Sequence, residues 1–136
     1  MAGSANPRYL SGMKRSLLLP LPLALMASPA VATGGFHCRA ADGSNIAMSG
    51  TIGHVIAAPL VGAALHLGER TLSTTDQSPQ VAIGRSWIDE REIRVDLVDA
   101  QFMRFEAQLR ARVTRDGAVG TLVREGRTHR VRCEVE

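Results

Sequence analysis

Arginines are the residues of this sequence whose type and spacing point most clearly to a binding chemistry. Residues 33 to 100 hold five Arg and eight acids, a net charge of −3, whereas residues 101 to 136 hold eight Arg and five acids, a net charge of +3. Four arginines in the second segment alternate with apolar residues, so we expect them to share one type of face. These candidate binding residues are Arg110, Arg112, Arg130 and Arg132. Guanidinium groups bind carboxylates or phosphates through paired hydrogen bonds. The alternative is that Glu106 and Glu134 neutralise them.

The histidines and serines do not have the spacing of a known catalytic or metal site. No two of the four histidines are two or four residues apart, so no metal-ligand pattern is visible. The serines occur in neither a G-x-S-x-G nor an S-x-x-K motif. The sequence therefore predicts a protein that is not an enzyme and that holds no metal or cofactor.

A cluster of acids could in principle supply a general acid and base, but its setting favours a solvated face. The cluster consists of Asp89, Glu90, Glu92 and Asp96. Arg91 and Arg94 are interleaved with it, and we expect Arg94 and Asp96 to form a cross-strand ion pair.

The chain has two cysteines, Cys38 and Cys133, close to the two ends of the segment that follows an apparent export signal. An even pair in an exported protein predicts a disulfide, with two free buried thiols as the alternative. A disulfide would also bring the segments of His37 and His129 together. That leaves open a two-histidine or histidine-carboxylate site, or a His37 that points outward while His129 packs near Val131.

Period-two alternation defines the secondary structure. Residues 105 to 113 place Phe, Ala, Leu, Ala and Val on one side and Glu, Gln, Arg and Arg on the other, and 92 to 98 and 128 to 135 alternate similarly. Such alternation predicts half-buried strands, because the same apolar set would wrap around a helix. Turn markers such as Asp116-Gly117 separate the runs. The predicted strands are 36 to 41, 45 to 52, 59 to 67, 70 to 74, 80 to 88, 92 to 98, 103 to 113, 118 to 124 and 127 to 135.

These strands predict an all-β fold, an antiparallel meander of eight or nine strands that closes into a barrel or barrel-like sandwich. A disulfide between the first and last strands would fit that closure. Residues 54 to 65 are the exception, because they also allow one helix.

The first 32 residues have the three parts of a secretory signal peptide. Lys14-Arg15 is a basic start, residues 16 to 27 form a short apolar run, and Ala30-Val31-Ala32 supplies a cleavage site. The apolar run is too short for a spanning helix, which needs roughly 20 residues. We therefore expect Met13 to be the true start, residues 33 to 136 to form a single secreted domain without a transmembrane segment, and the location to be periplasmic or secreted.

The predicted mature segment has 13 Arg, 13 acids and no Lys, so its net charge is zero. Nucleic-acid and carbohydrate binding are both disfavoured, because a row of exposed aromatic platforms is missing, and a global basic field for nucleic acids is missing as well. Trp87, beside a turn, is expected to plug the core near one end of the barrel.

The chain resembles the bacterial periplasmic inhibitors of C-type lysozyme in its layout. Phe36-His37-Cys38 at the start and Val131-Arg132-Cys133 at the end correspond to that family's terminal-strand disulfide. The resemblance implies a small exported β-barrel. The family's serine, glycine and tyrosine signature is missing, so no functional residue is carried over.

The leading hypothesis is an exported, non-enzymatic β-domain that binds a protein or a small anionic partner through its arginine face. The alternatives are a hydrophobic-ligand carrier with an apolar rim at 54 to 67, a lysozyme-inhibitor-like envelope protein, or a small hydrolase with an unrecognised site.

Overall fold

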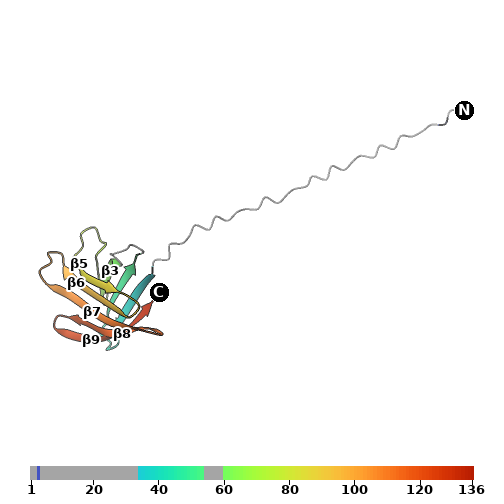
Figure 1. Ribbon diagram of the computed structural model, residues 1–136. Helices are drawn as coiled ribbons and strands as arrows, with labels where there is room; N and C mark the ends of the chain where they lie inside the picture. The colour runs from blue at the N-terminus through green and yellow to red at the C-terminus, as the bar shows by residue number, and fades with distance from the viewer. Residues whose placement is uncertain (1–2, 4–33, 54–59) are drawn as a thin grey trace. The chain divides into compact units, whose positions relative to one another are not determined.

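The computed structural model describes residue 3 and residues 34–53 and 60–136, and the described residues form nine β-strands (Figure 1). The strands are β1 (Gly34–Ala40), β2 (Ile46–Ile52), β3 (Leu60–Leu67), β4 (Arg70–Ser73), β5 (Val81–Ile88), β6 (Glu92–Asp99), β7 (Phe105–Thr114), β8 (Gly117–Arg124) and β9 (Arg127–Val135). All nine predicted strands are confirmed, with ends that differ by no more than two residues. The predicted signal segment lies outside the described residues, apart from Gly3. The described part of the chain contains no helix with the length and apolar character needed to span a membrane.

The helix considered for residues 54 to 65 is wrong in its second half. Residues from Leu60 onward belong to β3, which pairs with β2 on one side and β4 on the other. Two ladders satisfy the backbone of this segment, so it does not need the internal hydrogen bonds of a helix. Residues 54 to 59 lie outside the described part of the chain.

All nine strands belong to one antiparallel sheet in the order β4-β3-β2-β1-β9-β8-β7-β6-β5, which curls into a nearly closed barrel. The first and last strands of the chain, β1 and β9, pair with each other in the middle of this order. The unpaired edges of the sheet are therefore β4 and β5, and the place where these two edges meet is here called the seam. Neighbouring strands run in opposite directions, so β4 and β5, the first and the ninth in this order, run in the same direction. Consequently the two strands that border the seam cannot form an antiparallel ladder with each other.

Residues 74–80 run back along the barrel at this seam. Thr74 donates its backbone N–H to the carbonyl of Ala63 at 2.9 Å, which fixes the start of the segment to β3. At the other end, Arg70 donates to the side-chain oxygen of Gln80 at 3.0 Å. Of these two hydrogen bonds, the one from Arg70 to Gln80 crosses from β4 to the residue before β5, whereas the Thr74 bond continues the pairing of β3 with β4.

The turn between β8 and β9 shows how the sequence sets the register. Glu125 and Gly126 have φ values of 50° and 73°, which is the pattern of a two-residue type I′ hairpin. This turn places Arg124 opposite Arg127 and carries the pairing through to Ala118 and Cys133.

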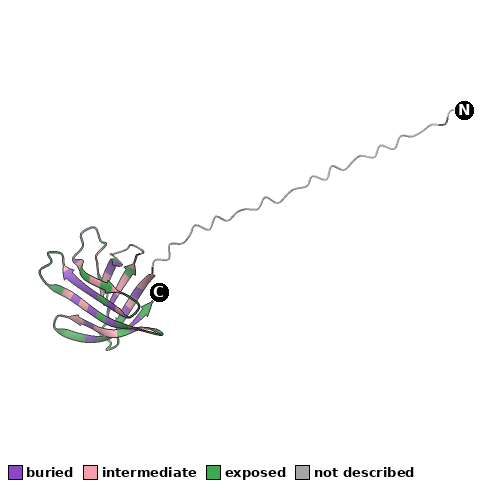
Figure 2. Cartoon of the chain, viewed as in Figure 1, coloured by how far each residue is buried: buried purple, intermediate pink, exposed green. Residues whose placement is uncertain are grey.

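Inward side chains form one continuous core, visible as the purple segments in Figure 2. The largest fully buried side chains include Met48, Leu65, Ile93, Leu109 and Leu122. The predicted apolar faces of β6, β7 and β9 supply much of this core, as the period-two pattern requires.

Phe105 departs from the predicted alternation, because it is 60% exposed although the pattern placed it inside. The register shifts at this point, with Leu97 opposite Ala107 but Val98 opposite Phe105. Glu106 is therefore an extra residue in a β-bulge, and residues before a bulge take the opposite phase. The bulge turns Phe105 outward and leaves Glu106 with a largely covered side chain.

Cys38 and Cys133 form a disulfide between β1 and β9, as predicted, with a sequence separation of 95. The two residues are directly opposite each other in the ladder, and both are buried. A structural disulfide indicates an oxidising, non-cytoplasmic environment.

Candidate functional site

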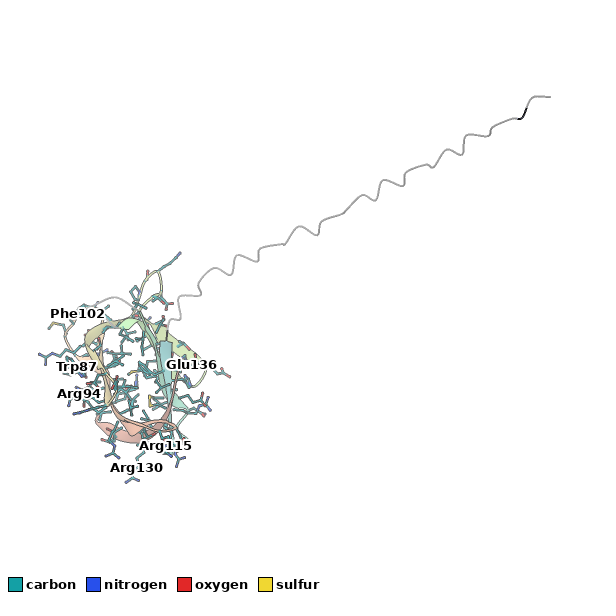
Figure 3. The ribbon with its side chains drawn as sticks, turned by 45° about the vertical axis from the view of Figure 1, so that its right-hand side comes forward. Trp87, Arg94, Phe102, Arg115, Arg130 and Glu136 are labelled. Carbon is teal, nitrogen blue, oxygen red and sulfur yellow. A yellow bond between two sulfur atoms is a disulfide. The ribbon has the colours of Figure 1, made fainter. Side chains whose placement is uncertain are left out.

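The candidate site is the outer face of β6, β7, β8 and β9, where two rows of side chains cross the strands. Directly opposite residues of an antiparallel sheet point to the same face. The first row is formed by Trp87, Arg94, Arg110, Thr121 and Arg130, each opposite the next. The predicted binding residues Arg110 and Arg130 therefore share the outer face, and the other two, Arg112 and Arg132, lie in the second row on the same face. Figure 3 shows Arg94 and Arg130 on the outside of the ring of strands.

The second row lies two residues along each strand and extends onto β1. It consists of Glu92, Arg112, Val119, Arg132 and Arg39, again each opposite the next. Arg39 was not among the predicted site residues. The signal that could have found it is the disulfide, because pairing Cys38 with Cys133 places Arg39 opposite Arg132.

The space between these rows is a groove of about 1610 Å³, here called the arginine groove. Its floor includes Ala111, Gly120 and Val131, which form the cross-strand line between the two rows. Positions two residues apart on a strand are about 6 to 7 Å apart, so the two rows of side chains begin about that far apart on either side of the floor.

Gly120 is required by this geometry, because a Cβ at that position would lie 1.9 Å from the carbonyl oxygen of Arg110 on β7. Any side chain there would push β7 and β8 apart. The residue thus permits the close approach of two strands that together carry both rows.

The charge in the groove is strongly unbalanced. Its lining includes two acids, Asp89 and Glu92, and six arginines. The arginines are Arg91, Arg94, Arg110, Arg112, Arg130 and Arg132. Arg94 pairs with Glu92 at 3.0 Å. Among the ion pairs of the described residues, none involves Arg112, Arg130 or Arg132.

Arg110 differs from the other three predicted residues, because it is anchored. Its Nη2 lies 2.8 Å from Asp96 Oδ1, and its Nη1 donates to the carbonyl of Leu109 at 2.7 Å. Asp96 is only 5% exposed, and Gln108 also reaches it at 3.5 Å. Arg110 therefore positions the first row while its own charge is compensated.

Two expectations about the acids were wrong. Asp96 is a buried member of the Arg110 pair, neither solvated nor paired with Arg94, because the guanidinium of the neighbouring strand covers it. Glu106 does not neutralise the candidate face either. It pairs with Arg104 at 3.2 Å and lies 4.0 Å from Arg124, because the bulge turns its side chain away from the groove.

The expectation that Trp87 plugs the core was also wrong. The side chain is 58% exposed and lines the groove at the end of the first row. Trp87 lies opposite Arg94, an outward position, on a strand that borders the seam and has a β-bulge at Gly84. Its indole Nε1 donates to Asp89 Oδ2 at 3.0 Å, so the ring is held in place.

The three histidines that the structure describes form two separate groups, and His54 lies outside the described residues. His129 is buried and its Nδ1 lies 2.6 Å from Asp42 Oδ2, so a histidine-carboxylate pair exists, but with an acid of the β1–β2 turn. His37 lies on the outer face, with its ring 5.8 Å from that of His66. His66 in turn is 3.0 Å from Ser49 Oγ and 3.3 Å from Thr71 Oγ1. Burial and the nearby His37 lower the pKa of His66.

Within residues 34–53 and 60–136, no three His, Cys, Asp or Glu side chains are grouped so that they could hold a metal ion. Comparison with known proteins found no matching protein family, no matching curated protein and no matching solved structure. The arginine groove therefore has to be interpreted from its own geometry and charge.

Proposed function

We propose that this protein is an exported, non-enzymatic β-barrel that binds an anionic partner in the arginine groove. The observation that carries the proposal is the pair of cross-strand rows in which Arg112, Arg130 and Arg132 face solvent without a carboxylate partner among the described residues. An anion is the ligand that such a face recognises best, since each guanidinium can bind it through two hydrogen bonds.

The arrangement has an energetic consequence that supports a ligand. Like charges directly opposite each other destabilise a sheet, and here Arg94 faces Arg110 while Arg132 faces Arg39. The Asp96 and Glu92 pairs offset the first of these contacts. A carboxylate or phosphate bound to Arg132, which lines the groove although Arg39 does not, would offset the second.

Export to the periplasm or the cell exterior is part of the proposal. It is supported by the disulfide between β1 and β9 and by the basic, apolar and small-residue segments of the first 32 residues. A carrier of lipids inside the barrel is less well supported, because the inward side chains of the described strands, such as Leu65, Leu97 and Leu109, are fully buried against each other.

Equilibrium binding to three polyanions of matched charge tests the proposal. The probes are oligogalacturonate, poly-glutamate and inorganic polyphosphate, measured by calorimetry. We expect saturable binding of at least one probe, and about tenfold weaker binding by the double variant Arg112→Gln/Arg132→Gln.

The matched control is Arg115→Gln/Arg127→Gln, which removes two exposed arginines that do not line the groove. It should bind as tightly as the unaltered protein. Failure of all three probes to bind, or an equal loss in the two double variants, would contradict the assignment of the groove.

A further inference from the structure

We infer that the ligand of the arginine groove is a segment of an acidic polysaccharide, with Trp87 as the platform on which one sugar ring stacks. This inference rests on the proposed function and adds the chemical class of the anion. It starts from the combination, in one groove, of unpaired guanidinium groups and a fixed, exposed indole.

The indole of Trp87 is exposed and held in one orientation. A large aromatic side chain is normally largely buried, yet this ring is 58% exposed in the groove. Asp89 fixes it through Oδ2, while Oδ1 of the same carboxylate accepts from the backbone N–H groups of Arg91 and Glu92, both at 2.8 Å. The carboxylate of Asp89 therefore holds the indole in one orientation, and it accepts hydrogen bonds from three N–H groups.

The orientation of the indole is set by hydrogen bonds to Asp89 within the β5–β6 turn. The backbone hydrogen bonds from Arg91 and Glu92 and the indole hydrogen bond lower the pKa of Asp89, so this acid stays ionised in its role as acceptor. A ring held in this way loses little conformational freedom when a ligand stacks on it.

The groove continues from this ring across the strands. The first row leads from Trp87 past Arg94 and Arg110 to the hydroxyl of Thr121 and the free Arg130. A chain lying in the groove would meet the ring first and then guanidinium and hydroxyl groups. Sugar acids offer the matching groups, because a pyranose has an apolar face for stacking, hydroxyls for hydrogen bonds and a carboxylate for arginine.

Other polyanions match the groove less well. Single-stranded nucleic acids are bound on successive aromatic platforms, whereas Trp87 is the only aromatic residue that lines this groove among the described residues. An acidic peptide accounts for the arginines, but it would need an apolar or aromatic side chain next to its carboxylates to pack on the indole as well. A lipid needs a continuous apolar surface, and here charged side chains outnumber the exposed apolar ones, Trp87 and Val119.

Tryptophan fluorescence gives a direct test, because Trp87 is the only tryptophan of the chain. Oligogalacturonate is titrated into the full domain, beside its fully methyl-esterified form and a poly-glutamate of equal charge. We expect oligogalacturonate to bind at least about tenfold more tightly than either control and to change the emission of Trp87.

Variants at the ring separate stacking from charge. Calorimetry should show about tenfold weaker oligogalacturonate binding for Trp87→Ala and partial recovery for Trp87→Phe, while poly-glutamate affinity is unchanged. Circular dichroism checks the fold of both variants. If Trp87→Ala does not fold, the emission change of the unaltered protein and the affinity of Trp87→Phe still test whether a sugar ring stacks on Trp87.

The outcomes distinguish this inference from the proposed function. Equal affinity for poly-glutamate and oligogalacturonate, with unchanged emission, would overturn the polysaccharide ligand and leave an anion site. Tight binding of the methyl ester alone would overturn the role of the arginines. If the unaltered protein binds none of the polyanions, both proposals are overturned.

Discussion

Arg39 and Arg132 lie directly opposite each other on β1 and β9, one residue away from the Cys38–Cys133 disulfide in the same ladder. The covalent bond fixes the register of these two strands, so the two exposed arginines stay opposite each other in the ladder. A surface that keeps like charges opposite each other in this way is suited to an anion that bridges them.

Loss of the disulfide should destabilise the barrel strongly. The bond closes a loop across 95 residues and joins the first strand to the last. The chain-entropy model gives up to about 4.7 kcal/mol for such a loop, and removal of a native disulfide typically costs about 2 to 5 kcal/mol. Urea unfolding of Cys38→Ala/Cys133→Ala measures the effect. A change of less than about 1 kcal/mol would contradict a structural role.

The Arg110–Asp96 pair should matter for stability, whereas the free arginine of the same row should not. Arg110→Gln leaves the buried carboxylate of Asp96 without its 2.8 Å partner, and we expect a loss of about 1 to 3 kcal/mol. Arg130→Gln, the matched control, should change stability by no more than about 0.5 kcal/mol. Equal losses in the two variants would show that Asp96 does not depend on Arg110.

Acid should weaken the link between the β1–β2 turn and β9. Hydrogen bonds from Ser44 and His129 lower the pKa of Asp42 from 3.8 to about 2. The stabilisation is fully present above the unfolded pKa of 3.8 and is lost as the pH falls toward 2. Thermal unfolding between pH 5 and pH 2 should therefore show a steeper decline for the unaltered protein than for Asp42→Asn. Parallel declines would contradict the link.

Phe102 is strained in the β6–β7 turn, and a residue that tolerates a left-handed backbone should relieve the strain. Its φ is 58°, while Asp99 accepts from the backbone N–H groups of Met103 and Arg104 at 2.7 and 2.9 Å. Phe102→Asn should raise the free energy of unfolding by about 1 kcal/mol. Met103→Asn, an exposed neighbour without a positive φ, should have little effect. The same change in both would point away from backbone strain.

The strands could be predicted from the sequence because alternation and turn residues are local signals. Residues 105 to 113 alternate in sequence, and from Ala107 onward the burial follows that pattern. The bulge at Glu106 could not be predicted in this way, because an inserted residue depends on how β6 and β7 meet. Phe105 was placed on the wrong face for that reason.

The candidate site was only partly predictable. Alternation placed four arginines on one type of face, but it does not say which residues are opposite each other. That depends on strand register, which brings Arg39 beside Arg132 and Trp87 beside Arg94. Burial of Asp96 depends on the reach of Arg110 from the next strand, so a sequence pattern within β6 could not reveal it.

The most direct test of the central claim is the salt dependence of polyanion binding. Affinity for the tightest-binding of the three probes is measured between 50 and about 200 mM salt for the unaltered protein and for Arg112→Gln/Arg132→Gln. A groove that binds phosphate or carboxylate through these arginines predicts an affinity that falls with salt, and a shallower slope for the variant because fewer counterions are released. An affinity independent of salt, or an identical slope for the variant, would contradict binding in the arginine groove.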